Sequence, residues 1–316
     1  MKGNFGLLAG AIAVGGIFAG SALTADRYLT HRNEQLNSPL PSLMAAVAVV
    51  NLKSPISIAL DLANRKMYWI DNEGKQIQRA NLDGSSVENL VMTGLENPRD
   101  IALDLRRGKM YWTNRGDQKI LRANLDGSRV EILLSKGIET LENPEGIALD
   151  LANSKMYWVN SDPPAIVRAT LDGTRIEYLT TANVKKPTDI ALDLRKGKMY
   201  WIDSETKMIQ RASLDGRDTE ILVSGLKNPG ELALDLTHNK IYWTDEDTDT
   251  IQRANLNGTP IEILVSRSLN GVRNPHGIAL DVTRGKMYWT DREARKIQRA
   301  NLDGSSIEDL AIGINE

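Results

Sequence analysis

The sequence predicts an all-β fold, a six-bladed β-propeller with four antiparallel strands per blade, preceded by an N-terminal apolar helix. Three observations lead to this prediction. The dipeptide Tyr-Trp occurs six times, at intervals of 43, 46, 43, 42 and 46 residues. Each repeat divides into four short apolar or alternating runs bounded by turn residues. Residues 5–25 carry no charged side chain. Four strand-sized runs in a repeat of this length are typical of a propeller blade.

Composition and charge exclude several classes of protein. The chain has 316 residues, with 39 Lys and Arg against 41 Asp and Glu, so the net charge is −2. A nucleic-acid-binding domain would usually be clearly basic, and an apolar content of 41% excludes wholesale disorder. Cysteine is absent, which excludes disulfides, thiolate metal sites and a Cys nucleophile. With three histidines, a His-rich metal site is not expected either.

The N-terminal segment is predicted to be separate from the repeats. In a helix, the apolar stretch Phe5–Ala25 would span the roughly 30 Å core of a bilayer. A cleaved signal peptide is the rival interpretation, because the start is basic and small residues lie near the expected cleavage point. Residues 1–25 are therefore predicted to be a signal peptide or a transmembrane anchor, residues 26–42 a polar linker, and residues 43–316 the propeller. We expect an exported, extracytoplasmic protein that is secreted or anchored by this segment.

The strands of each repeat follow in a constant order. The first ends in Ala-Leu-Asp, the second holds Tyr-Trp, the third reads like Ile-Gln-Arg-Ala-Asn-Leu-Asp-Gly, and the fourth is a closing run such as Val87–Met92. A loop proline precedes each first strand, namely Pro55, Pro98, Pro144, Pro187, Pro229 and Pro275. Runs of this length are too short for helices. One blade cannot bury both its faces, so neighbouring blades must cover them in a closed ring.

Two side-chain packing roles and one additional strand are expected. Side chains alternate across a strand, so Tyr68 and Trp69 point to opposite faces and one ring packs against each neighbouring blade. The Arg that recurs in the third strand, such as Arg79, is expected to stack on the adjacent Trp or to pair with the Asp of Leu-Asp-Gly. Residues Leu43–Val50 read as an extra apolar strand, which either latches the ring at the outer edge of the last blade or only caps that edge.

The repeated motif also carries a resemblance. Residues Tyr242–Asp245 and Tyr288–Asp291 read Tyr-Trp-Thr-Asp, and the other four copies vary only the last two positions. With its flanking signatures this motif resembles the YWTD-repeat β-propellers of the low-density-lipoprotein receptor family over residues 43–316. The resemblance implies six blades with Tyr-Trp in the second strand of each. Because the Cys-rich modules of the animal receptors are missing, lipoprotein or Wnt-pathway roles are not expected, and the chain looks more like a bacterial exported propeller.

Candidate binding residues lie where the repeat varies. We call the face with the loops from strand 4 to strand 1 and from strand 2 to strand 3 the top face. The two residues after each loop proline enter strand 1 there, at the mouth of the central channel. In propellers of the family, the residue after this proline often contacts peptide ligands. This role transfers to Arg99, Glu145, Thr188 and His276, with Asp100, Asp189 and Glu231 beside them. Four acids against one Arg and a neutral His predict an acidic mouth, and hence a protein or peptide partner that is basic or amide-rich.

Two functions from different classes remain open. The first is an exported or membrane-tethered scaffold that presents the top face to a protein or peptide. The second is a metal-dependent hydrolase of the lactonase or gluconolactonase type, because the four acids of the mouth are hard oxygen donors. No Ser-His-Asp order, glycine-rich phosphate loop or carboxylate pair stands out from the repeats. We therefore assign no catalytic residue, no metal site, no cofactor and no nucleic-acid partner, and expect membrane contact only through an uncleaved N-terminal segment.

Overall fold

The computed structural model describes three stretches of the chain, namely residues 47–137, 141–179 and 182–314. They belong to one compact unit, Ala45–Glu316. The predicted N-terminal helix and the linker lie outside the described residues. Helical structure within them consists of the short helix α2 (Arg267–Asn270) and the 3₁₀ helix η1 (Val282–Arg284). In this part of the chain no helix is long and apolar enough to cross a membrane.

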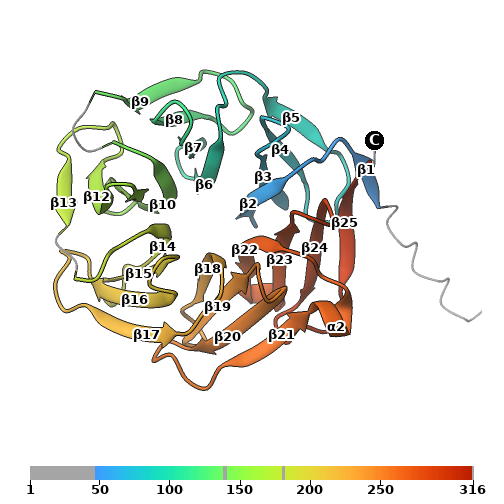
Figure 1. Ribbon diagram of the computed structural model, residues 1–316. Coiled ribbons are helices and arrows are strands. Elements are labelled where there is room, and N and C mark those ends of the chain that lie inside the picture. Colours follow the sequence, from blue (N-terminus) through green and yellow to red (C-terminus); the bar gives the residue numbers. More distant parts are fainter. Residues whose placement is uncertain (1–46, 138–140, 180–181, 315–316) are drawn as a thin grey trace, which may run out of the picture. The chain divides into compact units, whose positions relative to one another are not determined.

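Six sheets surround a central axis, one for each repeat of the described chain (Figure 1). The innermost strands begin at the loop proline: β2 (Pro55–Asp61), β6 (Pro98–Asp104), β10 (Pro144–Asp150), β14 (Pro187–Asp193), β18 (Pro229–Asp235) and β22 (Pro275–Asp281). The second strands hold Tyr-Trp: β3 (Lys66–Asp71), β7 (Lys109–Asn114), β11 (Lys155–Ser161), β15 (Lys198–Asp203), β19 (Lys240–Asp245) and β23 (Lys286–Asp291).

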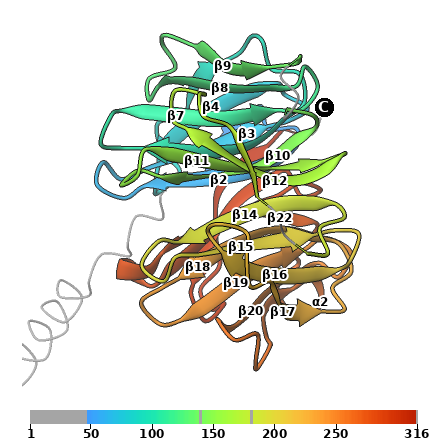
Figure 2. The same ribbon diagram turned by 90° about the vertical axis from the view of Figure 1, so that its left-hand side faces the viewer.

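The two outer strands of each blade complete the antiparallel sheets. The third strands hold the recurring Arg: β4 (Gln76–Asn81), β8 (Lys119–Asn124), β12 (Pro164–Thr170), β16 (Met208–Ser213), β20 (Thr250–Asn255) and β24 (Lys296–Asn301). The outermost strands are β5 (Glu88–Val91), β9 (Glu131–Ser135), β13 (Glu177–Leu179), β17 (Glu220–Ser224), β21 (Glu262–Ser266) and β25 (Glu308–Gly313). Figure 2 views the ring from its side, where the strands of each blade run between the two faces. The prediction of a six-bladed all-β propeller is confirmed.

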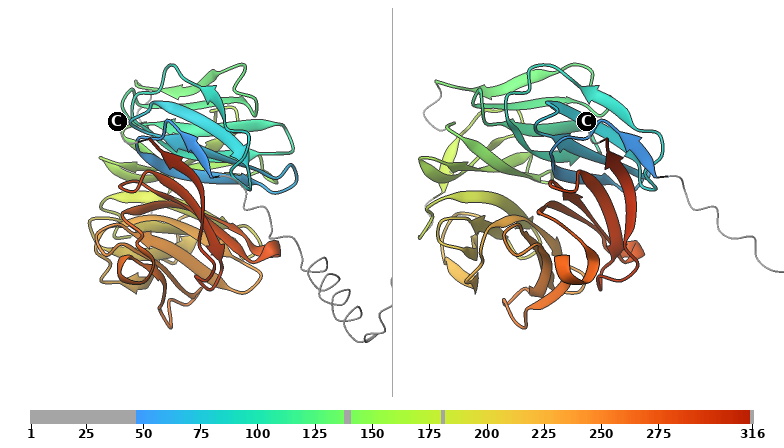
Figure 3. Two further views of the ribbon diagram at one scale, coloured as in Figure 1. Left: turned by 90° about the vertical axis from the view of Figure 1, so that its right-hand side faces the viewer. Right: turned by 45° about the vertical axis from the view of Figure 1, so that its right-hand side comes forward.

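A short strand closes the ring. β1 (Ala48–Val50) pairs in parallel with β25, with Ala48 opposite Ala311 and Val50 opposite Gly313. The sixth sheet therefore has five strands, and Figure 3 shows β1 beside β25. Because the chain continues from β1 directly into β2 of the first blade, this pairing joins the first blade to the last. The described part of the predicted extra strand is thus a latch, while residues 43–46 lie outside the described residues.

The core lies between the blades. In the described chain, the Tyr of each blade packs with the Trp of the next, as Tyr157 does with Trp201 and Tyr288 with Trp69 across the closing interface. The six Trp side chains are 0% exposed and the six Tyr at most 2%. Each pair sits among aliphatic residues of both blades. The predicted packing role of Tyr-Trp is confirmed.

The recurring arginine has different partners from those predicted. The Arg79 guanidinium carbon lies 5.7 Å from the centre of the Tyr68 ring, and its Nη2 lies 2.5 Å from Glu88 Oε2. Arg79 also donates to the carbonyl of Leu125 in the next blade, at 3.1 Å. The predicted stacking on Trp or pairing with the Leu-Asp-Gly Asp is wrong. Tyr68 and Glu88 lie directly opposite Arg79 in the sheet, so all three side chains share one face, whereas Trp69 points to the other.

Candidate functional site

An irregularity at the start of each inner strand directs side chains toward the axis. In the second blade the register between β6 and β7 shifts between Pro98 and Ile101. The same shift occurs in the other five blades. A bulge bends its strand and changes the direction of the side chains there. The two residues after Pro98, Arg99 and Asp100, consequently lie where the six inner strands meet the top face.

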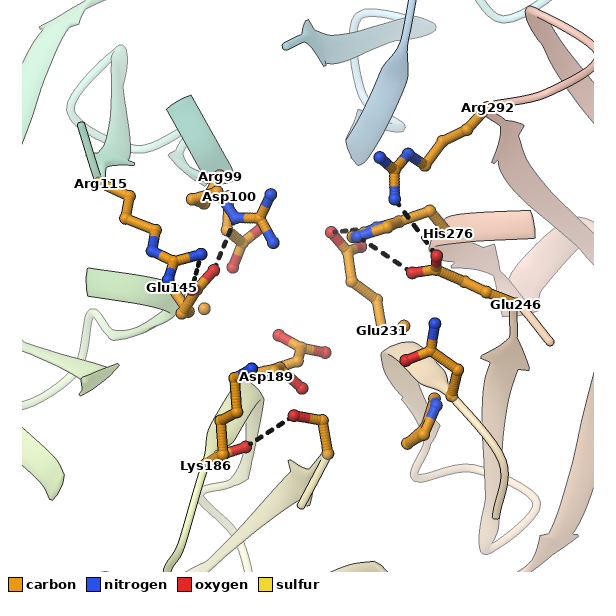
Figure 4. A pocket seen from close by; sticks show the side chains of 16 residues that line it. Arg99, Asp100, Arg115, Glu145, Lys186, Asp189, Glu231, Glu246, His276 and Arg292 are labelled. Atoms are coloured by element: carbon orange, nitrogen blue, oxygen red, sulfur yellow. Dashed lines mark hydrogen bonds and ion pairs between the residues drawn. The ribbon is translucent and has the colours of Figure 1, made fainter. Parts of the chain in front are cut away.

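The structure brings all seven candidate residues together around one recess at the axis, with a cavity of about 210 Å³ (Figure 4). They are Arg99, Asp100, Glu145, Thr188, Asp189, Glu231 and His276. We call this recess the mouth. Five of these residues are buried, while Arg99 and Thr188 are partly exposed. The Thr188 hydroxyl has no hydrogen-bond partner among the described residues.

Four further charged side chains line the mouth, and the sequence pattern did not indicate them. Arg115, Glu246 and Arg292 each lie in a loop from the second to the third strand, and Lys186 precedes a loop proline. The loop position also varies between blades: its residues are Asn72, Arg115, Ser161, Ser204, Glu246 and Arg292. Variation at this loop position is the sequence signal from which Arg115, Glu246 and Arg292 could have been predicted.

The complete lining corrects the predicted charge of the mouth. Besides His276, it contains five carboxyl and four basic side chains. The prediction of an acidic mouth counted a single Arg. With three more basic side chains and one more acid, the charges nearly balance, so the electrostatic reason for a basic or amide-rich partner is lost.

One wall of the mouth holds two arginines on a single carboxylate. Glu145 Oε2 accepts a hydrogen bond from Arg99 Nε at 2.6 Å, and its Oε1 lies 3.1 Å from Arg115 Nη1. The Ser161 hydroxyl also donates to Oε1, at 3.1 Å. The Glu145 side chain is 3% exposed, while those of Arg99 and Arg115 are 22% and 33% exposed. We call Arg99 and Arg115 the arginine pair. With Glu145 it carries a net positive charge.

The opposite wall is electrically balanced. Arg292 Nη1 lies 3.2 Å from Glu246 Oε2, and His276 Nε2 lies 3.5 Å from Glu246 Oε1. Burial lowers the pKa of His276 well below its usual value, and the charges of Arg292 and Arg99 lower it further. His276 is therefore neutral at pH 7 and forms no ion pair with Glu246, or with Glu231 at 3.9 Å from its Nδ1. This Nδ1 has no hydrogen-bond partner in the described chain.

Three buried carboxyl groups point toward the axis (Figure 4), and we call them the inner acids. Asp100 Oδ2 accepts a hydrogen bond from the backbone nitrogen of Ile147, at 2.6 Å. Asp189 Oδ2 accepts one from Leu232 N at 2.7 Å. The third, Glu231, accepts one from Ile278 N at 3.3 Å. Each inner acid thus ties its own blade to the next.

Burial changes the protonation of the inner acids. It raises the pKa of Asp189 to about 8, and the charge of Asp100 adds to this effect. Burial also raises the pKa of Asp100 to about 6 and that of Glu231 well above its usual value. At neutral pH, Asp189 consequently holds a proton in most molecules. Among the described residues, no group of three or more His, Asp or Glu has the arrangement of a metal site.

The raised pKa of Asp189 predicts that stability falls as pH rises toward 8. A carboxyl whose pKa is higher in the folded state stabilises the fold at low pH, and this contribution is lost as pH rises through the folded value. For Asp189, whose pKa is raised from 3.8 to about 8 in the folded state, we expect the melting temperature to fall between about pH 5 and pH 8 and to level off above. Asp189→Asn should flatten that slope, while the exposed Glu205→Gln should not. Differential scanning calorimetry checks this; an unchanged slope in Asp189→Asn would contradict it.

A family model and two curated relatives resemble the chain. The model of the low-density lipoprotein receptor repeat class B matches at residues 65–105, 108–151, 154–194, 197–236, 239–282 and 285–312. A low-density lipoprotein receptor-related protein 1 of Pyricularia oryzae is 36% identical over 75 residues, which are 24% of this chain and 24% of that protein. The human low-density lipoprotein receptor-related protein 4 is 37% identical over 74 residues, 23% of this chain and 4% of that protein. The aligned part is thus at most about a quarter of these relatives.

Solved structures share the fold. The crystal structure of a nidogen/laminin complex contains a chain that matches with a TM-score of 0.65 and 24% identity, over 72% of this chain and 84% of that one. Virginiamycin B lyase from Staphylococcus aureus, in a catalytically inactive variant with quinupristin, matches with a TM-score of 0.60 and 18% identity, over 82% and 86%. At these identities the likeness concerns the fold alone.

Proposed function

Because the chain belongs to the low-density lipoprotein receptor class B repeat family, we propose that it is a non-enzymatic scaffold whose top face binds a protein or peptide through the mouth. One observation carries the proposal. Residues that recur in every blade hold the ring together, as Tyr-Trp and the third-strand Arg do. The residues of the mouth differ from blade to blade, yet the fold gathers them around one cavity. Unlike the inner acids, partly exposed members of the lining such as Arg115, Thr188 and Ser204 do not recur as blade-to-blade contacts and are available for recognition.

The relatives and the N-terminal sequence support further parts of the proposal. The nidogen/laminin structure, which contains a chain of the same fold, is a complex between proteins and supports a protein partner. Export or membrane tethering is proposed from the uncharged stretch Phe5–Ala25, which has the length of a membrane-spanning or signal segment. In this view the propeller acts outside the cytoplasm.

A steric block of the mouth tests this function without regard to the chemistry of the partner. Ser204 lines the mouth from the loop after β15 and is partly exposed. In the full-length protein, Ser204→Trp should fill the recess and reduce partner binding at least tenfold. Arg106→Trp, in an exposed loop on the opposite face, is the matched control and should bind like wild type. Both are compared by affinity capture from the extracytoplasmic fraction, with mass spectrometry. Equal capture by wild type and Ser204→Trp would place partner binding elsewhere on the propeller.

A further inference from the structure

We propose that the arginine pair is a preformed receptor for a carboxylate, so that the partner inserts an Asp or Glu side chain into the mouth. The inference rests on the proposed function and names the chemistry of its ligand. It also reverses the expectation of a basic partner that the sequence alone gave.

The geometry of the pair leaves donors unused. A guanidinium has five N–H donors in a planar fork. The contacts to Glu145 use Nε of Arg99 and Nη1 of Arg115, and no other hydrogen bond of these two side chains occurs among the described residues. No nitrogen of Arg99 or Arg115 is a buried atom that lacks a hydrogen-bond partner. Both side chains are partly exposed and line the cavity. The remaining N–H groups are therefore accessible to a ligand in the mouth.

The buried carboxylate orients the pair in advance. Glu145 is held by three hydrogen-bonding or ionic contacts and is almost completely buried. Its two oxygens fix both guanidiniums on one wall, so little side-chain entropy remains to be lost when a ligand binds. A buried ion pair that is held by additional hydrogen bonds is a rigid element of this kind.

The pair has no counterpart in the other blades. At the position of Arg99 the other blades carry Ile56, Glu145, Thr188, Gly230 and His276. At the position of Arg115 they carry Asn72, Ser161, Ser204, Glu246 and Arg292. Four of the five other blades have no arginine at either position and still form part of the closed ring. The arginine pair is therefore not required by the repeat, unlike the third-strand Arg that pairs with Tyr and Glu in every blade.

The charge of the wall selects a singly charged anion. Arg99 and Arg115 carry two positive charges against the single negative charge of Glu145. One further carboxylate would balance the wall, and a carboxylate matches the guanidinium fork as well as a phosphate does. Across the mouth, Arg292 and Glu246 already neutralise each other. The inner acids repel an anion less than three ionised carboxylates would, because Asp189 and Glu231 tend to hold protons.

Binding of short labelled peptides to the full-length protein tests the proposal. The probes are a peptide of alternating Glu and Gly, its Gln-Gly counterpart, and a Lys-Gly peptide, all measured by fluorescence anisotropy at low ionic strength. We expect the Glu peptide to bind at least tenfold more tightly than the Gln peptide. Binding should weaken at least tenfold in Arg115→Gln and to an intermediate degree in Arg115→Lys, which keeps the charge but loses the planar fork. Arg175→Gln, in an exposed loop between β12 and β13, is the control and should change nothing.

Several results would overturn the inference. Equal affinity for the Glu and Gln peptides, preference for the Lys peptide, or undiminished Glu-peptide binding by Arg115→Gln would each do so. Inorganic phosphate that binds more tightly than the Glu peptide would show a phosphate site in place of a carboxylate site. The peptide comparison uses wild-type protein, so it decides the matter even if Arg115→Gln folds poorly. If Ser204→Trp abolishes partner binding while these charge tests fail, only the carboxylate inference falls and the proposed function stands.

Discussion

Replacing Trp201 with alanine is expected to lower the free energy of unfolding by about 3–5 kcal/mol, the usual cost of truncating a large buried aromatic side chain. The Trp201 side chain is 0% exposed and packs against Tyr157 of the preceding blade and against Ile190 and Met199 of its own. A cavity there removes contacts from two blades at once. The loss therefore weakens an interface on which the ring depends, as well as one sheet.

Urea denaturation and thermal melting of the full-length protein measure this effect. Ile221→Ala is the control, since Ile221 lies in outer strand β17 and is 52% exposed. Substitutions at such surface positions usually change stability by less than about 0.5 kcal/mol. If Trp201→Ala melted like Ile221→Ala, the packing role of Tyr-Trp would be refuted.

Substitution of Gly84 by alanine is expected to destabilise the ring by about 2–4 kcal/mol, which combines strain of a left-handed backbone with overpacking. Gly84 ends Leu-Asp-Gly in the first blade and has a φ of 85°. A Cβ placed there would lie 2.2 Å from the carbonyl oxygen of Leu310, in β25 of the last blade. Because a neighbouring backbone cannot move aside as a flexible side chain can, the substitution strains the interface that closes the ring.

Gly108→Ala provides a matched comparison. Gly108 has a φ of 64°, and no atom lies within 4 Å of the position that a Cβ would occupy. The corresponding residue of the first blade is Arg65, with a φ of 54°, so this turn accepts side chains in the same protein. We expect Gly108→Ala to cost about 1 kcal/mol from backbone strain alone. Equal melting temperatures of Gly84→Ala and Gly108→Ala would show that close approach between blades is not what requires Gly84.

Local regularities of the sequence predicted the fold because a blade is built from neighbouring segments. Short runs separated by turn residues defined the four strands, and the alternation of side chains placed Tyr and Trp on opposite faces. The apolar run before the first loop proline predicted an extra strand, although the sequence left open whether it latches or caps the ring. Its parallel pairing with β25 connects segments at opposite ends of the repeats, and nothing in the local pattern specifies such a partner.

The seven candidate residues of the mouth could be found because they occupy the two variable positions that follow a recurring proline. Arg115, Glu246 and Arg292 come from the loop between strands 2 and 3, which the sequence placed on the same face without indicating that it reaches the axis. Only the folded ring shows that this loop lines the same recess. The third-strand Arg shows the same limit. From the sequence alone, this Arg side chain could contact several groups. The register of the sheet places it opposite Tyr68 and Glu88.

By itself the sequence determined the number of blades, the order of strands and the packing of Tyr and Trp side chains between blades. These features depend on periods and spacings that the chain carries locally. The tertiary structure alone decided how the ring is latched, which charges face one another in the mouth, and which carboxyl groups are buried deeply enough to hold protons near pH 7. The physical reason is that charge pairing and desolvation depend on distances between residues of different blades, often more than 40 positions apart, and those distances exist only once the ring has closed.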